Sequence, residues 1–505
     1  MIRKATVEGG VVRGIPAADP RITAFKGIPF AAPPVGENRW RAPQPVIPWE
    51  GELDCLTFRP ISMQHIPGLD KDNIYSREWN VDPEIPMDED CLYLNVWTPA
   101  KSPDEKLPVY VWFFGGGLKE GNPAEMEFDG ERLARRGIVV VTLNYRLNCF
   151  GFLAHPQLTK EQPDAPSNFG HLDQQAGVRW AKRNIAAFGG DPDNITIGGQ
   201  SAGGGSVCAQ LTSPQNEGLF QRAIIQSGIM AGVYGTFFPG AKNSFAAAEE
   251  QGERFFEFLG VKTLEEARKI DAVTLRDKCE EFGAMFGTTQ DGVFQTGDAN
   301  INIMKGNNWR VPLMITRTED EFAMGLMSMD KEDFKAKAVE IFGEDADEFM
   351  RICSGEHGEA VKKSFANGLE IAIRSLAKQR KTLGIDDPVY YAIFDAEIPG
   401  WDNPGTFHSV DLWFYFETLA KCWRPFVGKH YDLSRKMCNY WANFIRSGDP
   451  NGNDADGTPM PEWKPFTDDE PNLMRWGDTV EAVVEGPDAL HALLAKTYLK
   501  KNING

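Results

Sequence analysis

The amino-acid sequence predicts an α/β protein with a large, mostly parallel central sheet that is flanked by helices. Three observations support this fold class. Short apolar runs have the length of buried strands, the segments between them have helical periodicity, and no repeat or long low-complexity linker divides the 505 residues. Buried strands that alternate with helices are typical of parallel sheets, because each crossover connection needs a helix-length segment.

Six apolar runs are predicted to form the strands of this sheet. They lie at 109–114, 138–145, 194–198, 222–226, 311–316 and 389–394. The segment 172–188 is predicted to be a helix, because its apolar residues recur on one side and the pair Gly189-Gly190 ends it.

Two other regions depart from this alternation. Residues 5–30 contain short runs separated by turn residues, which predict small antiparallel strands near the N-terminus. The stretch 230–380 is charged and rich in helical patterns, so we expect helical insertions that form a cap over the sheet. We expect residues 1–505 to form a single domain.

Charge and composition exclude several classes of protein. The formal net charge is −19, and hydrophobic residues make up 42% of the chain. This balance is ordinary for a globular protein and argues against nucleic acid or an anionic membrane as a partner. The longest apolar runs are too short to span a bilayer, and the first residues contain no apolar run typical of a leader. We therefore expect a soluble cytoplasmic protein, either a monomer or a small homo-oligomer.

The eight cysteines contain no Cys-x-x-Cys pair, so we do not expect a zinc site. In the cytoplasm they would be reduced thiols that are mostly buried as small apolar side chains. We expect no metal and no cofactor, because the chemistry predicted below requires neither.

Residues 199–203 read Gly-Gln-Ser-Ala-Gly and predict a nucleophilic serine, Ser201. The pentapeptide follows the predicted strand 194–198 and precedes helix-like sequence, which is the setting of the nucleophile elbow in the α/β-hydrolase fold. The pentapeptide alone is a weak signal. However, the three glycines at 203–205 would each weaken the following helix by about 1 kcal/mol, so backbone packed too closely for a Cβ explains them better than a flexible loop does.

Three glycines at 115–117 directly follow the first predicted strand of the sheet. Cleavage of an ester forms an oxyanion that needs two or three fixed N–H donors. In this fold the donors are the amide of the residue after the nucleophile, here Ala202, and amides of the loop after an earlier strand. A triple glycine lets that loop turn its amides inward, whereas an ordinary turn would need only one or two glycines.

A serine hydroxyl needs a histidine base, and the chain order in this fold is serine, acid, histidine. The histidines that follow Ser201 are His357, His408, His430 and His491. His408 lies in a Pro/Gly loop that leads into aromatic sequence, so it could enter a partly dry pocket. The other three lie in polar or helical sequence.

The acid is expected just past a strand of the sheet. Glu319, Asp320 and Glu321 follow the fifth predicted strand, and Asp395 follows the sixth. The residues alone do not choose among these four carboxylates, because several of them could simply be solvated.

A series of ordered motifs resembles the type-B carboxylesterases, which include cholinesterases and bacterial para-nitrobenzyl esterases. The similarity runs over almost the whole chain, and it implies an α/β-hydrolase fold and ester hydrolysis. Besides the triple glycine, the motifs are FKGIPFAAPPVGENRWRAPQP at 25–45, EDCLYLNVWTP at 89–99, NYRLNCFGFL at 144–153, NFGHLDQQAGVRWAKRNIAAFGGDPDNITIGGQSAG at 168–203, AIIQSG at 223–228, DEFAMGL at 320–326, GTFHSVDL at 405–412 and YWANFIRSGDPN at 440–451.

The resemblance implies a catalytic triad, and it selects one of the four carboxylates. The triad consists of Ser201, Glu321 and His408. The resemblance also places the oxyanion donors, which are Gly116, Gly117 and Ala202.

Two structural ion pairs are implied by the same resemblance, Arg39 with Glu89 and Arg146 with Asp173. Two further positions are implied to orient loops near the site, and they are Ser227 and Asp411.

The chain departs from the family pattern at several positions. Phe322 replaces the usual glycine after the acid, which could narrow the pocket or shift the acid. Phe114 stands where many bacterial members have histidine. Ser62 stands where the family's early disulfide has the partner of Cys91, so Cys91 is expected to lack that partner, although Cys55 lies close in sequence.

Aromatic residues near these motifs are candidates for the walls of the substrate pocket. They are Trp112, Phe114, Phe322 and Trp413, although core packing explains each of them equally well. Trp79 is similar to the aromatic residue that stacks on cationic choline, but its spacing differs.

The sequence thus predicts a serine carboxylesterase that hydrolyses small to medium aryl or alkyl esters through an acyl-enzyme. Its expected partner is a small-molecule ester. Two alternatives stay open: the same machinery could hydrolyse amides, thioesters or lactones, or the chain could be a binding protein like the adhesion members of the family. The adhesion members have broken triads, whereas all three triad positions here carry competent residues.

Overall fold

The computed structural model describes residues 1–70, 72–232, 244–322, 331–352 and 364–503. His357, Cys353 and the end of the motif at 320–326 lie outside these ranges.

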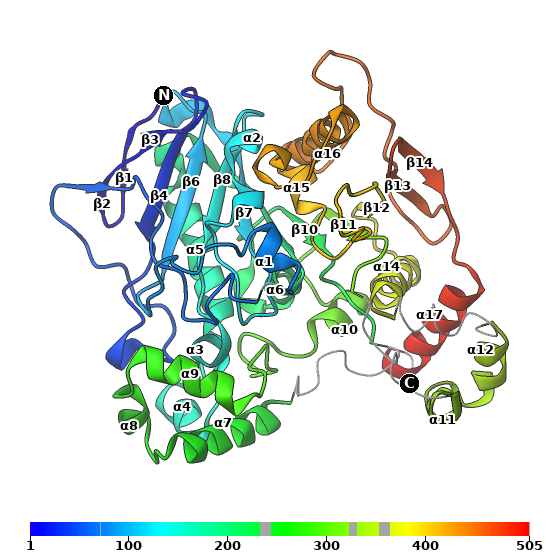
Figure 1. The fold of residues 1–505 in the computed structure, drawn as a ribbon, viewed down its shortest axis with the longest axis horizontal. Coiled ribbons are helices and arrows are strands. Elements are labelled where there is room, and N and C mark those ends of the chain that lie inside the picture. The colour runs from blue at the N-terminus through cyan, green and yellow to red at the C-terminus, as the bar shows by residue number, and fades with distance from the viewer. Residues whose placement is uncertain (71, 233–243, 323–330, 353–363, 504–505) are drawn as a thin grey trace.

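A twisted central sheet runs through the molecule (Figure 1). Within the described residues it has eleven strands in the order β14-β13-β12-β11-β10-β9-β7-β8-β6-β4-β3. Neighbouring strands from β8 to β13 are parallel, and the pairs toward both edges are antiparallel. The strands are β3 (Ile15–Pro16), β4 (Thr23–Pro29), β6 (Tyr93–Thr98), β7 (Leu107–Phe113), β8 (Val139–Leu143), β9 (Gly190–Gln200), β10 (Arg222–Gln226), β11 (Leu313–Thr318), β12 (Val389–Phe394), β13 (Asn472–Trp476) and β14 (Val480–Val484).

The predicted fold class is confirmed, and each of the six predicted strands is present. The N-terminal strands differ in part from the expectation. β1 (Lys4–Val7) and β2 (Gly10–Arg13) form an antiparallel pair in a small sheet, with β5 (Glu52–Asp54) parallel to β2. The later run of the same region is β4, which pairs with β6 and so belongs to the central sheet.

Helices cover both faces of the sheet (Figure 1). α5 and α6 contact β9 on one face, and α2 and α16 contact β7 and β8 on the other. The helices are α1 (Tyr75–Glu78), α2 (Glu131–Ala134), α3 (Asn148–Phe152), α4 (Pro156–Glu161), α5 (Phe169–Asn184), α6 (Ala202–Thr212), α7 (Phe245–Leu259), α8 (Leu264–Arg268), α9 (Ala272–Phe282), α10 (Ala299–Met304), α11 (Lys331–Phe342), α12 (Ala346–Ile352), α14 (Ser364–Leu383), α15 (Leu412–Tyr415), α16 (Gly428–Ser447) and α17 (Ala489–Asn502).

The helix predicted at 172–188 is present as α5, followed by a 3-10 turn over Ile185–Phe188. Gly189 ends this turn with a φ of 77°, a left-handed conformation that glycine adopts without steric cost. Helices within 230–380 belong to more than one layer. α7 and α9 pack near α3 around a separate hydrophobic cluster, whereas α14 contacts β11 of the central sheet.

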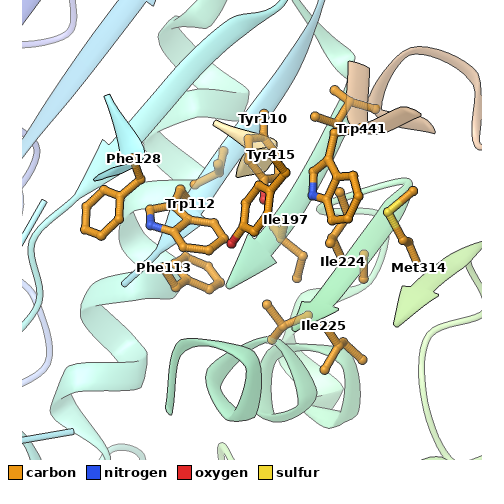
Figure 2. Close-up of a cluster of buried hydrophobic side chains, with 14 of the residues drawn as sticks. Tyr110, Trp112, Phe113, Phe128, Ile197, Ile224, Ile225, Met314, Tyr415 and Trp441 are labelled. Atoms are coloured by element: carbon orange, nitrogen blue, oxygen red, sulfur yellow. The ribbon is translucent and has the colours of Figure 1, made fainter. Parts of the chain in front are cut away.

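An aromatic core fixes the strands beneath α15 and α16 (Figure 2). Trp112 of β7 is fully buried, and its ring lies 5.7 Å from that of Phe128 and 6.2 Å from that of Tyr415, measured between ring centroids. Tyr415 in turn stacks on Trp441 of α16 at 4.8 Å. Each large apolar side chain removed from water contributes roughly 1.5–3 kcal/mol, so this cluster holds the carboxyl ends of the parallel strands in a fixed relation.

Both implied ion pairs are present and buried. Arg39 Nε lies 2.5 Å from Glu89 Oε1, and Arg146 Nη2 lies 2.7 Å from Asp173 Oδ1. In the described part of the chain no helix is both long enough and apolar enough to cross a membrane.

The seven cysteines in the described residues are free thiols. Cys55 and Cys91 are both buried and do not pair. Burial raises the pKa of each of these two thiols to about 12, so both are uncharged at neutral pH.

Candidate active site

Ser201 lies in the sharp turn between β9 and α6. Its φ of 58° and ψ of −125° are strained for a residue with a Cβ, and its amide donates a hydrogen bond to the carbonyl of Gln226 at 2.8 Å. The flanking glycines are needed for packing. A Cβ on Gly199 would lie 2.3 Å from the carbonyl oxygen of Gly203, and one on Gly203 would lie 2.1 Å from that of Phe113. The geometry is that of a nucleophile elbow.

The loop after β7 lines the same cavity as Ser201. Gly116 and Gly117 have φ values of 105° and 66°, which glycine adopts readily. Among the described residues, neither of these amides nor that of Ala202 donates a hydrogen bond to the protein. Ala202 is the first residue of α6, where the helix dipole favours negative charge.

His408 and Glu321 meet directly although 87 positions separate them in the chain. Nδ1 of His408 forms a short hydrogen bond with Oε2 of Glu321. The other carboxyl oxygen, Oε1, accepts hydrogen bonds from Ser227 Oγ at 2.6 Å and from the Thr318 amide at 2.9 Å. Both side chains are almost completely buried. Every oxygen of the carboxylate is thus held in place by a donor.

The charge state of Glu321 follows from these contacts. Burial alone would raise its pKa, but the charge of His408 and the hydrogen bonds from His408, Ser227 and Thr318 outweigh burial and lower the pKa. Glu321 is therefore ionised at neutral pH. It can orient the imidazole and stabilise an imidazolium.

The other carboxylates considered from the sequence have different partners. Asp320 accepts hydrogen bonds from the amide of Thr406 at 2.8 Å and from its hydroxyl at 3.0 Å. Glu319 lies 3.5 Å from Arg317. Asp395 directly follows β12. Glu321 is the carboxylate that contacts His408.

The other described histidines after Ser201 have partners other than the carboxylates considered from the sequence or the residues of the Ser201 turn. His430 accepts a hydrogen bond from the amide of Val427, and His491 contacts Asn367 and Asp488.

Two contacts of His408 were not foreseen from the sequence. Its Nε2 lies 3.2 Å from the side-chain nitrogen of Gln200, the residue before the nucleophile. Its carbonyl accepts a hydrogen bond from the Tyr75 hydroxyl at 3.0 Å. Gln200 was visible within the pentapeptide, but its role depends on His408 approaching β9, which local sequence does not encode. No feature of the sequence indicated that Tyr75 would contact His408.

Two cavities meet at the nucleophile. Cavity A has a volume of about 270 Å³ and is lined by residues that include Gly116, Ser201, Phe322 and His408. Cavity B has a volume of about 290 Å³ and is lined by Ser201, by small or apolar residues, which include Ala202, Gly205, Cys208, Ala209, Met230 and Met285, and by polar residues, which include Thr288, Gln290, Gln295, Asp298 and Asn300. Gly117 and Ser201 border both cavities, so a ligand held at Ser201 can extend in two directions.

A third cavity, C, of about 450 Å³ adjoins cavity A. It shares Gly117, Lys119 and Glu120 with cavity A, and its other lining residues include the exposed side chains of His65 and Glu280.

The aromatic candidates for the pocket walls occupy different places. Phe322 lines cavity A and stacks on the imidazole of His408, with ring centroids 4.1 Å apart. Trp112, Phe114 and Trp413 are fully buried in the hydrophobic core and are not among the residues that line the three cavities. Phe114, for example, stacks on Tyr145 at 4.2 Å.

Cavity A also contains three acidic residues that sequence reasoning missed, Glu120, Glu125 and Glu127. They lie in a loop with no motif, among many acidic residues of an acidic chain, so nothing in the sequence marked them. Within the described residues, no group of three or more His, Cys, Asp and Glu side chains is arranged to hold a metal ion.

Comparison with known proteins agrees with this architecture. A PNB esterase superposes with a TM-score of 0.82 and 27% identity, covering 98% of this chain and 99% of that one. The carboxylesterase of Geobacillus stearothermophilus superposes with a TM-score of 0.78 and 29% identity, covering 97% of this chain and all of that one. The fold is therefore the α/β-hydrolase fold.

Sequence relatives define the family. The model of the carboxylesterase family matches residues 2–367 and 361–492. A fumonisin B1 esterase of Sphingopyxis macrogoltabida is 32% identical over 475 residues, or 88% of this chain and 82% of that protein. A cholinesterase of Mus musculus is 30% identical over 511 residues, or 92% of this chain and 81% of that protein. The chain belongs to the carboxylesterase family and is a carboxylic ester hydrolase.

Proposed function

We propose that the protein hydrolyses carboxylic esters through a covalent intermediate on Ser201. His408 takes the proton of the Ser201 hydroxyl as the oxygen attacks the ester carbonyl, and Glu321 stabilises the imidazolium. His408 then protonates the leaving alcohol and afterwards activates the water that releases the acid. One observation carries this proposal: His408, held by the Glu321 carboxylate, and Ser201 line one cavity although they come from distant parts of the chain.

The oxyanion of each tetrahedral intermediate would be held by the amides of Gly116, Gly117 and Ala202. These amides have no partner among the described residues, and they border the two cavities at Ser201. Each such donor typically contributes roughly 2.7–4 kcal/mol to transition-state stabilisation.

The two cavities would divide the substrate between them. His408 must reach the leaving oxygen to protonate it, and His408 lines cavity A but not cavity B. The alcohol part therefore occupies cavity A, and the acyl part occupies cavity B. A volume of about 290 Å³ and a largely apolar lining suit short to medium acyl chains.

The test is a comparison of Ser201→Ala with the unaltered protein on p-nitrophenyl butanoate. The alanine variant should lose the acylation burst, and kcat should fall by roughly six orders of magnitude, because the nucleophile is removed. Intact-protein mass spectrometry after acid quenching should detect a butanoyl group on the unaltered protein but not on the variant.

Ser213→Ala is the matched control. Ser213 ends the same helix, α6, and its hydroxyl is buried without a partner among the described groups, so this variant should retain the burst. Full activity of Ser201→Ala would overturn the proposal. Faster cleavage of a matched butanoyl anilide than of the ester would identify an amidase instead.

A further inference from the structure

Phe322 lies against the imidazole of the candidate base, His408. The two ring centroids are 4.1 Å apart and the ring planes are inclined by 30°, so the phenyl ring covers one face of the imidazole. Both residues line cavity A, but only 2% of the His408 side chain is exposed. The phenyl ring is therefore part of the environment that keeps water away from His408.

The backbone explains why these two rings meet. Glu321 and Phe407 form an isolated parallel bridge. Phe322 and His408 directly follow them in the chain, so the two rings start from adjacent positions. Tyr75 supports the pair from another side, because its ring is perpendicular to that of Phe322 at 6.4 Å and its hydroxyl donates to the carbonyl of His408. Backbone pairing and Tyr75 together hold the two rings in this arrangement.

In the proposed reaction the imidazole changes from a neutral base into a cation. The Glu321 carboxylate can only accept a hydrogen bond, so Nδ1 of His408 carries the proton that faces it. Nε2 then takes the proton of Ser201, and the resulting positive charge is shared by the whole ring. Glu321 meets this charge at the edge of the imidazole, whereas Phe322 meets it at the face.

The face of a phenyl ring attracts cations, because its π electrons give it a negative partial charge. The attraction acts on a cation within about 6 Å of the ring centroid, and it is stronger where water is excluded. A neutral imidazole is attracted less than an imidazolium. Phe322 would therefore stabilise the transition state more than the bound substrate, which is the condition for an increase in rate.

We propose that Phe322 is a positioning residue for ester hydrolysis, which holds the imidazole of His408 by stacking and stabilises the imidazolium through its ring face. This inference rests on the proposed function, because it needs His408 to act as the base. The family pattern has glycine at this position, so the contribution is a feature of this chain.

Fluorinated phenylalanines at position 322 test the electrostatic part of the proposal. Each fluorine withdraws electrons from the ring face and changes the shape of the side chain little. Mono-, di- and trifluorophenylalanine should therefore lower kcat for p-nitrophenyl butanoate progressively, by about tenfold over the series. KM should change by less than about twofold, because acylation and deacylation both pass through the imidazolium and are slowed together.

Phe256 provides a matched control. It stacks on His155 at the same centroid distance of 4.1 Å and at a similar angle of 27°. Phe256 belongs to the separate hydrophobic cluster around α7 and α3, and it lines none of cavities A, B and C. Trifluorophenylalanine at position 256 should therefore change kcat by less than about twofold.

Two ordinary substitutions separate the ring from its bulk. Phe322→Leu keeps an apolar side chain without a π face, so kcat should fall by about tenfold or more. Phe322→Tyr keeps the π face and should retain at least about half of kcat.

Failure of the proposed function and failure of this inference give different results. If the unaltered protein does not cleave p-nitrophenyl butanoate, the proposed function fails, and this inference fails with it. If the unaltered protein cleaves the ester but kcat stays constant across the fluorinated series, or if Phe322→Leu retains full kcat, only this inference fails. An equal fall in kcat for fluorination at positions 256 and 322 would also overturn it, because a general loss of stability would then be the cause.

Discussion

Two carboxyl groups near the imidazole are held in opposite charge states by their surroundings. Glu321 is surrounded by donors and stays ionised beside His408. Asp411, which precedes α15, is buried, and its Oδ1 has no partner among the described groups. Burial, and then the charge of Glu321, raise the pKa of Asp411 to about 8. The uncharged Asp411 therefore adds no second negative charge next to Glu321 at neutral pH.

Asp411→Asn should stabilise the protein more at high pH than at low pH. In the unfolded chain this carboxyl loses its proton near pH 4, whereas the folded protein keeps the proton up to about pH 8. Stability therefore falls as pH rises through this window. The variant avoids this loss, so its advantage in the free energy of unfolding should grow by about 2 kcal/mol or more between roughly pH 5 and pH 8.

Urea unfolding at both pH values measures this difference. The exposed Asp386, changed to asparagine, is the control. An equal response of the two variants to pH would contradict a retained proton on Asp411.

At the scale of elements, the glycines after Ser201 lower the intrinsic stability of α6 and allow α6 to lie close to β7. α6 begins with three glycines after Ala202, which are poor helix formers. The first of them lets the helix approach β7 closely enough for the carbonyls of Phe113 and Phe114 to occupy the space of a side chain. The strained backbone of Ser201 is held by this contact and by its bond to Gln226.

Glycine-to-alanine substitutions in α6 should therefore have opposite effects. Gly203→Ala places a Cβ 2.1 Å from the Phe113 carbonyl oxygen, so we expect a loss of about 3 kcal/mol or more in the free energy of unfolding. At Gly205 the nearest atom would lie 3.9 Å from a Cβ, so Gly205→Ala should be neutral or gain up to about 1 kcal/mol.

Denaturant unfolding of both variants measures these effects. Similar losses in the two variants would mean that helix flexibility, rather than close backbone packing, explains the glycines.

At the scale of the whole molecule, the parallel sheet places the segments that carry the candidate site residues next to one another. The carboxyl ends of β7, β9 and β11 lie at one edge, so the segments that follow them bring Gly116, Ser201 and Glu321 together. The segment after β12 returns to the same edge with His408. The space left between these segments forms cavities A and B on the two sides of Ser201.

Filling cavity B should shorten the acyl chain that the enzyme accepts. Gly287 lines cavity B, and a Cβ at this position would meet no atom within 4 Å. Gly287→Leu should therefore fold and lower the ratio of kcat/KM for p-nitrophenyl butanoate to that for the acetate by about tenfold or more. Gly486→Leu is the control, since that position is exposed and also open. An unchanged acyl preference, with lower rates for bulky alcohols, would reverse the assignment of the two cavities.

The strands and the nucleophile elbow were predictable because their causes are local. A buried strand needs an apolar run, and the elbow needs glycines near Ser201. Both features can therefore be recognised in short stretches of sequence. The acid was not predictable in this way. Glu319, Asp320 and Glu321 are adjacent, and a carboxylate has the same local signature whether it faces solvent or an imidazole. The motifs that resemble carboxylesterases selected Glu321, and the contact with His408 agrees with that selection.

By itself the sequence determined the α/β class, the order of the strands along the chain, the serine turn and the glycine loop. Tertiary structure alone decided that Glu125 and Glu127 face the same cavity as Ser201, that Gln200 and Tyr75 contact His408, and that Trp112 fills the core. The physical reason is the separation along the chain between the groups that determine each property. Backbone conformation and glycine packing depend on neighbours in the chain, whereas burial, pKa and cavity shape depend on groups that meet only after the sheet has assembled.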